Sequence, residues 1–170
     1  MDIVTPRLCL RAWQDSDLPA LVSLLGDAQT MAHWPQPYDQ AGARDWLRRA
    51  QHSMAEWGFA RSCCVRLSDN QIVGDVGIMR MDIQGTPRFD LGYIIHRDYW
   101  RQGYALEACR GLVTWAQEQR LPELVATMAT DNLPSAGVAQ KLGMRLEDTF
   151  VNPRNAGKET YFYRLSLPLT

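Results

Sequence analysis

The stretch from Asp98 to Ala108, DYWRQGYALEA, places one glycine and a basic residue between an apolar alternating run and an amphipathic run. A helix that starts near Gly103 has several backbone N–H groups without intrahelical partners, and they carry a partial positive charge. Gly103 lets a ligand approach the backbone closely, and Arg101 adds a full charge. The stretch is neither G-x-G-x-x-G nor a P-loop. It indicates a turn that can bind an anion such as diphosphate, although such a glycine is also typical of an ordinary turn.

A second polar pattern lies in residues 130–144, TDNLPSAGVAQKLGM. Asn132 follows an expected strand, and Ser135 stands where a helix is expected to start. Each residue alone is typical of a turn or of a helix N-terminus. An anion-type turn, a crossover helix, a parallel strand and then N-x-x-S is a less common combination, and it favours a functional site.

The elements that position these residues follow from the periodicity of apolar residues. Alternating or apolar runs predict strands over 5–13, 59–67, 72–83, 88–96, 123–130, 144–151 and 160–167. Helical spacing predicts helices over 15–25, 39–57, 105–121 and 135–142. The helix between strands 88–96 and 123–130 predicts that these two strands are parallel. We expect a single α/β domain over residues 1–170 with a mixed sheet.

Composition limits the possible functions. The 18 basic and 19 acidic residues give a net charge of −1, which predicts no nucleic-acid partner and no membrane surface. The N-terminus does not read as a signal peptide, and no segment approaches the ~20 apolar residues of a membrane span, so we expect a cytoplasmic protein. The four cysteines include no C-x-x-C pair and are expected to be reduced core residues. No cluster has metal-ligand spacing, so no metal is expected.

Taken together, five motifs resemble the GNAT-superfamily N-acetyltransferases, and more narrowly the RimJ/RimL-like branch. They are TPRLCLRAW, IVGDVGI, DLGYIIHRDYWRQGYALEA, TDNLPSAGVAQKLGM and YFYRLSL. The resemblance implies a single GNAT-like domain with a mixed, mostly antiparallel sheet of six to seven strands and helices on both faces. It also implies a splay between the fourth and fifth strands, 88–96 and 123–130.

The resemblance further implies acetyl-CoA as cosubstrate. The family's Q/R-x-x-G-x-G/A pattern falls on residues 100–105, where Gly103 and Ala105 match. Trp100 replaces Gln or Arg, and Arg101 stands where this branch often has glycine. The diphosphate would lie on Arg101, Gln102, Gly103, Tyr104, Ala105 and Leu106. The pantetheine arm would pair with backbone groups of Ile94, Ile95 and His96 and contact the side chain of Asn132.

Acetyl transfer needs a neutral amine, a polarised carbonyl and a stabilised thiolate. By resemblance, Ser135 would hydrogen-bond the leaving sulfur, and Asp90 would act as base through water. The alternatives are that Ser135 is only a helix N-terminal residue and that Asp90 is a surface residue paired with Arg88 or another cation. Tyr93 shares a strand face with apolar residues and is expected in the core, whereas His96 stands at a strand end.

The acceptor site is expected in the variable loops, with His33, Trp34 and Tyr38, loop 151–158 and the region near Trp57; ordinary packing is the preferred role for Trp57. The sequence leaves the acceptor open among a protein N-terminus, a ribosomal protein, a polyamine, an amino acid and an antibiotic amine. One alternative is a transferase that uses a longer acyl-CoA as the donor. Another is a domain without catalysis that senses CoA or binds a partner. A monomer and a homodimer are both compatible with the pattern.

Overall fold

A computed structural model describes residues 2–168. Its strands form one eight-stranded sheet in the order β1-β2-β3-β4-β5-β6-β8-β7. They span Ile3–Val4 (β1), Leu8–Arg11 (β2), Arg61–Arg66 (β3), Gln71–Ile83 (β4), Thr86–Ile95 (β5), Glu123–Ala129 (β6), Arg145–Asn152 (β7) and Lys158–Ser166 (β8). All neighbours are antiparallel except β5 and β6, which are parallel, as predicted. The strand beyond the six or seven expected is β1, whose two residues are too few to show an alternation.

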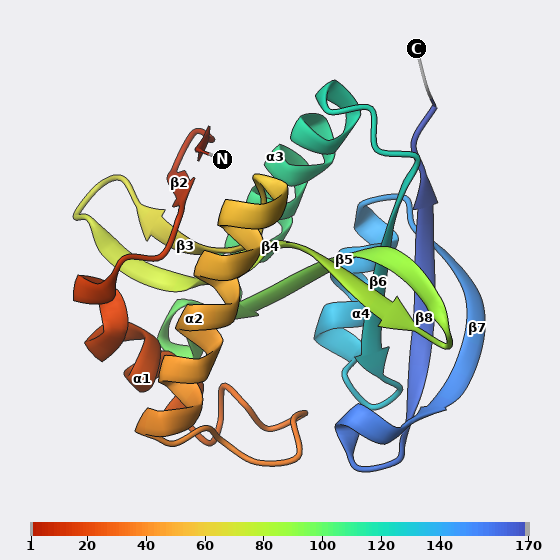
Figure 1. Cartoon of the computed structure of the whole chain (residues 1–170), viewed down its shortest axis with the longest axis horizontal. Coiled ribbons are helices and arrows are strands. Elements are labelled where there is room, and N and C mark those ends of the chain that lie inside the picture. The colour runs from red at the N-terminus through yellow and green to blue at the C-terminus, as the bar shows by residue number, and fades with distance from the viewer. Residues whose placement is uncertain (1, 169–170) are drawn as a thin grey trace.

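The helices cover both faces of the sheet (Figure 1). They span Leu18–Gly26 (α1), Gln40–Trp57 (α2), Tyr104–Glu118 (α3) and Leu133–Lys141 (α4). Buried residues of α1 and α2 belong to one apolar cluster, and those of α3 and α4 belong to another. The predicted helices on both faces are therefore confirmed.

The boundaries of α2 illustrate how the sequence sets these elements. Asp39 precedes the helix, and its side chain accepts a hydrogen bond from the N–H of Gly42 at 2.8 Å. Gly58 ends the helix with a left-handed φ of 75°, a conformation that glycine adopts without steric cost. The helix α2, bounded in this way, packs on the β3–β5 part of the sheet and contributes side chains to the candidate site.

The two faces of β5 follow from strand alternation. Leu91 and Ile95 are part of the cluster under α3 and α4, whereas Ile94 is part of the cluster under α1 and α2. Asp90 therefore lies on the α1/α2 face, and Tyr93 lies on the α3/α4 face. The predicted division of β5 between the two faces is confirmed.

The predicted splay lies between β5 and β6. These strands pair only at Asp90 and Val125, although β5 continues to Ile95 and β6 to Ala129. Beyond that pair, the facing edges of both strands lack a strand partner. This gap is the one place within residues 2–168 where adjacent strands of the sheet separate over half their length.

The cysteines lie in or near the core, as expected. Cys63, Cys64 and Cys109 are buried, Cys9 is half-buried, and all are free. Burial raises the pKa of the Cys63 thiol to about 12, so this thiol stays protonated and is a poor nucleophile. Among the described residues, no helix combines the length and apolar character needed to span a membrane.

Candidate active site for acyl transfer

The turn between β5 and α3 presents backbone N–H groups. Arg101 and Gly103 both adopt left-handed backbone conformations, with φ values of 60° and 80°. Gly103 precedes α3, and the first intrahelical bond runs from the N–H of Glu107 to the carbonyl of Gly103 at 3.0 Å. The N–H groups of Gly103, Tyr104, Ala105 and Leu106 precede that bond and have no intrahelical acceptor. The turn thus has the backbone geometry that an anion site needs, and the φ of Arg101 explains why glycine suits this position.

Two residues that the sequence reasoning missed brace this turn. Arg7 Nε lies 2.6 Å from Glu107 Oε2, and Arg7 Nη1 donates to the carbonyl of Gln102 at 3.0 Å. The Arg7 guanidinium also stacks 4.6 Å above the Tyr104 ring. Burial opposes ionisation of Glu107, yet hydrogen bonds from Thr5 and Arg7 hold its pKa below the usual value. The Glu107 charge is therefore compensated beside the turn and does not oppose an anion there.

The end of β5 differs in detail from the expectation. The N–H of His96 donates to the carbonyl of Val73 at 2.9 Å, so the backbone of His96, and by alternation that of Ile94, is directed toward β4. Only Ile95, of the three residues expected to pair with pantetheine, directs its backbone into the gap. Its carbonyl already accepts from Trp100 Nε1 at 2.7 Å, which leaves its N–H for a ligand.

The side chain of His96 has a local role. Its Nδ1 accepts a hydrogen bond from the N–H of Asp98 at 3.3 Å and so caps the short 3-10 helix Arg97–Tyr99. The ring is half-buried, whereas a position beside the cofactor or an exposed one is expected for this residue at a strand end. The same Nδ1 atom lies 3.5 Å from Asp98 Oδ2, so the ring is engaged with the start of this short helix.

On the other side of the gap, Asn132 and Ser135 begin α4. Asn132 is the N-cap residue, and its Oδ1 accepts from the N–H of Ser135 at 3.3 Å. Ser135 is therefore in the first turn and is not itself the cap. Tyr93, from β5, donates its hydroxyl hydrogen to the Ser135 carbonyl at 2.7 Å and ties the two edges of the gap together. Within residues 2–168 the Ser135 hydroxyl makes no hydrogen bond, so it is available to a ligand.

Tyr93 itself is half-buried and lies at the edge of the core, close to the predicted core position. Its ring packs against the cluster under α3 and α4. Burial raises the pKa of its phenol far above the usual value, so the hydroxyl remains a hydrogen-bond donor at any ordinary pH. Tyr93 therefore positions Ser135 and does not carry protons.

Asp90 is a carboxylate that has no hydrogen-bond or ion-pair partner in the described part of the chain. Its side chain is half-buried, and Oδ1 is buried without a hydrogen bond among the described residues. Burial raises the pKa of Asp90 to about 6, although the positive charges of Arg61 and Arg154 lower it. The alternative pairing with Arg88 is wrong, because Arg88 Nη1 binds Glu123 Oε1 at 2.8 Å instead. Asp90 is thus ionised at neutral pH and can accept a proton.

A buried ion pair next to Asp90 was not predicted. Arg61 Nε donates to Asp75 Oδ2 at 2.7 Å, Arg61 Nη2 donates to the Asp75 carbonyl at 3.0 Å, and Trp13 Nε1 donates to Asp75 Oδ1 at 2.7 Å. The remaining Arg61 nitrogen, Nη1, lies over Gly92, where a Cβ atom would be only 1.5 Å from it. Gly92 therefore leaves the space that the guanidinium occupies.

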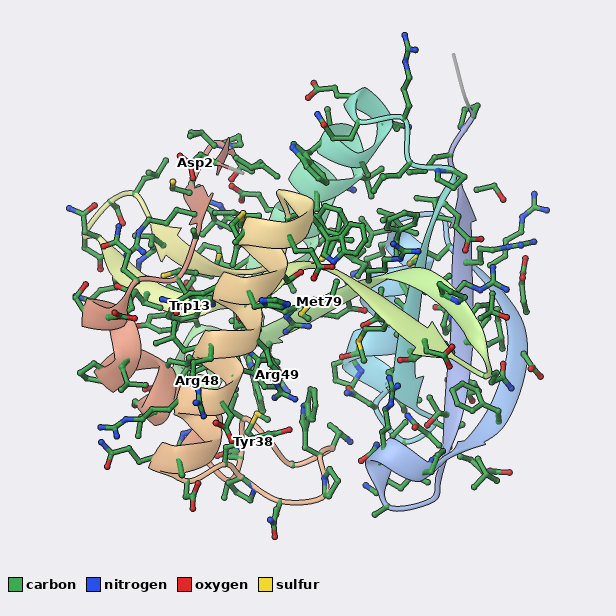
Figure 2. The ribbon with its side chains drawn as sticks, in the orientation of Figure 1. Asp2, Trp13, Tyr38, Arg48, Arg49 and Met79 are labelled. Carbon is green, nitrogen blue, oxygen red and sulfur yellow. The ribbon has the colours of Figure 1, made fainter. Side chains whose placement is uncertain are left out.

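Aromatic side chains gather on the same side. Trp34, Tyr38 and Trp46 have ring centroids 5.6 to 6.4 Å apart in edge-on arrangements. The guanidinium groups of Arg61 and Arg49 lie 5.5 and 5.7 Å from the Trp46 ring. Figure 2 shows Arg49 beside α2, on the side toward β5 and β6. We call Trp34, Tyr38 and Trp46 the aromatic wall.

The loops expected to bind the acceptor meet each other. His33 Nδ1 lies 3.2 Å from Asp131 Oδ1 at the end of β6, and Asn155 Nδ2 donates to the His33 carbonyl at 3.2 Å. The loop with His33 is thus joined to the loop 151–158. Trp57 is outside this group: the residue is 42% exposed, and its ring stacks with Arg80 at 4.5 Å.

Two observations concern the surroundings of the site: a nearby cavity and the arrangement of potential metal ligands. A cavity of about 780 Å³ lies between residues 2–7 and α3, and its lining includes Gly103 and Glu107 but not Asp90 or Ser135. It therefore adjoins the outer side of the turn, away from Asp90 and Ser135. In the described part of the chain, no group of three or more His, Cys, Asp or Glu side chains is arranged to hold a metal ion.

Known proteins show the same architecture. The model of the acetyltransferase (GNAT) domain matches residues 7–145. The chain is 28% identical to the protein YkkB of Bacillus subtilis over 86% of this chain and 87% of that protein. An acetyltransferase structure from Agrobacterium tumefaciens superimposes with a TM-score of 0.82 at 25% identity, covering 97% of this chain and 94% of that one.

The structural neighbours include ribosomal-protein acetyltransferases. RimL, described as a ribosomal L7/L12 alpha-N-protein acetyltransferase in complex with coenzyme A, has a TM-score of 0.80 at 18% identity, with 100% of both chains covered. At that identity the likeness concerns the fold. Because the GNAT domain model matches most of the residues, the chain belongs to the GNAT acetyltransferase family.

Proposed function

We propose that this enzyme transfers the acetyl group of acetyl-CoA directly to a primary amine while both substrates are bound. The observation that carries the proposal is the gap between β5 and β6, with free polar groups on its two faces. Ser135 lies on the α3/α4 face, where Tyr93 holds it, and Asp90 lies on the α1/α2 face. A thioester in the gap is thus reached by cofactor-side groups from one face and by an acceptor amine from the other.

The diphosphate of acetyl-CoA fits the turn that begins α3. The N–H groups of residues 103–106 supply donors and the positive end of the helix dipole. Arg101 adds a positive charge next to them. The Ile95 N–H, directed into the gap, is placed to bind the pantetheine arm or to polarise the thioester carbonyl. The Asn132 side chain lies opposite, at the start of α4.

The chemistry follows from the charges on each side. The neutral amine nitrogen attacks the carbonyl carbon, a C–N bond forms, and the C–S bond breaks with its electron pair leaving on sulfur. The amine proton passes to Asp90, directly or through water, because an ionised carboxylate with a pKa of about 6 can accept it. The Ser135 hydroxyl donates a hydrogen bond to the thiolate. An α-amine with a pKa near ~8 needs less help from the base than a lysine near ~10.4.

The proposal is tested by turnover with acetyl-CoA and a panel of primary amines. Thiol release and the mass of the acetylated amine are measured together, so that thioester hydrolysis is distinguished from transfer. We expect thiol release that depends on the amine and matches the acetylated product. Cofactor binding without turnover on any amine would favour a CoA-sensing module, and turnover only with a longer acyl-CoA would change the donor.

A further inference from the structure

The guanidinium of Arg61 is a buried cation with one free end. The residue is 7% exposed, and its Nε and Nη2 atoms are both bound to Asp75. Asp75 is fully buried and also accepts from Trp13, so the position of the guanidinium is fixed. Among the described residues, Nη1 has no hydrogen-bond acceptor, and it lies against Gly92 on the α1/α2 face. A rigid donor of this kind suits a carboxylate oxygen.

A second carboxylate on this face, besides Asp75, is Asp90. It stands two positions before Gly92 on β5, so the two Cα atoms are about 7 Å apart on the same side of the strand. No ion pair joins Asp90 to Arg61, and Asp90 Oδ1 has no hydrogen-bond partner within residues 2–168. This part of the face therefore offers one free donor and one free carboxylate at neighbouring positions.

The cations that act on Asp90 are Arg61, which is also bound to Asp75, and Arg154. The charge of Arg154, on the 3-10 helix Pro153–Asn155, also acts on Asp90, and that helix contacts the acceptor loop through Asn155. Within the described structure the Arg154 side chain makes no ion pair and is exposed. A polycationic acceptor would place further positive charge against these arginines. An acceptor with a negative charge beside its amine would instead be attracted to these arginines.

We propose that the acceptor is a small zwitterion, an amine that carries a carboxylate a few bonds away, as a free amino acid does. Asp90 binds the amine and Arg61 Nη1 binds the carboxylate, with Arg154 as a second, exposed cation. The aromatic wall then favours an aromatic or apolar body. This inference rests on the proposed function, and it narrows the acceptor to a class that excludes a peptide N-terminus, in which the carboxylate is an amide.

The test compares each amino acid with its own amide. L-Tryptophan and L-tryptophanamide, and L-methionine and L-methioninamide, share the side chain but differ in the negative charge, and kcat/KM is expressed per neutral amine because the carboxylate also raises the pKa of the amine. We expect kcat/KM for the acid to exceed that for the amide by about tenfold or more, because charge-assisted hydrogen bonds are the strong ones. Arg61→Lys keeps a charge beside Asp75 but removes Nη1, so the acid-to-amide ratio should fall to about one while acetyl-CoA binding persists.

Arg154→Gln supplies the second variant, in case Arg61→Lys fails to fold. The side chain is exposed, so folding should be unaffected, and the acid-to-amide ratio should fall about two- to fivefold. The matched control is Arg110→Gln, an exposed arginine on α3, on the opposite face of the sheet, which should leave the ratio unchanged.

The outcomes separate this inference from the proposed function. Equal turnover of acid and amide, or a ratio that Arg61→Lys and Arg154→Gln both leave unchanged, would overturn the zwitterion and leave the transferase intact. Acetylation of spermidine but of neither amino acid would do the same. If no amine of any class is acetylated although acetyl-CoA binds, the proposed function fails and the inference fails with it.

Discussion

Replacing Asp90 by asparagine should make the protein more stable and less active. The carboxyl has a pKa of about 6 instead of 3.8 because burial opposes its ionisation. Its contribution to stability is therefore greatest below about pH 4 and is lost as the pH rises through about 6. From this difference, ionising Asp90 in the folded protein costs about 3 kcal/mol, and less where solvent reaches the side chain. Asparagine keeps the shape and removes the charge.

The stability part of this prediction is measured by urea unfolding of both proteins at about pH 7 and about pH 4. Asp90→Asn should raise the free energy of unfolding by about 1–3 kcal/mol at the higher pH and by little at the lower one. A variant that is less stable than the wild type at neutral pH would refute the argument that Asp90 is a desolvated and unpaired carboxylate.

The activity part is measured as the pH dependence of amine-dependent thiol release. Wild-type turnover should fall as the pH drops below about 6, where Asp90 takes up a proton. In Asp90→Asn this acid limb should disappear, and turnover at neutral pH should drop by about 10²-fold or more, which is typical for loss of a general base. An unaltered pH profile would remove Asp90 from the mechanism even if the stability result holds.

Three further substitutions probe the surrounding contacts. Ser135→Ala should lower kcat, measured by thiol release, about tenfold or more, and calorimetry should show little change in acetyl-CoA affinity. If the variant keeps wild-type turnover, Ser135 is only a residue of the first turn of α4. Tyr93→Phe removes the hydrogen bond to the Ser135 carbonyl and should cost about 1 kcal/mol in urea unfolding while kcat falls; an unchanged kcat would contradict its positioning role. Gly92→Ala should cost about 1–3 kcal/mol, because the new methyl group displaces Arg61 Nη1, and a stability equal to the wild type would show that Arg61 moves freely.

The sequence was most informative where local signals coincide. The turn at Gly103 joins a strand pattern to a helical pattern, and both signals lie within a few residues, so the turn and α3 were predicted. The splay between β5 and β6 followed from the family resemblance. The strand β1 was missed because two residues cannot show periodicity.

Contacts between distant segments were not accessible in the same way. Arg7 and Glu107 are separated by 100 positions, and Trp13 and Asp75 by 62. No local pattern marks either pair. Similarly, the hydrogen-bond register with β4 decides that the backbone of Ile95, and not that of Ile94 or His96, faces the gap. The sequence of β5 alone does not contain that register.

We propose that the turn at residues 101–106 and the gap beside it hold acetyl-CoA. Calorimetric titration of acetyl-CoA into the wild type and into Gly103→Glu tests it most directly, with unfolding curves as a control for the fold. Saturable binding to the wild type that Gly103→Glu abolishes is expected, since the variant places a carboxylate against the diphosphate. Equal affinity in both proteins would contradict the assignment of the diphosphate to this turn, and no binding to the wild type would contradict acetyl-CoA as the cosubstrate.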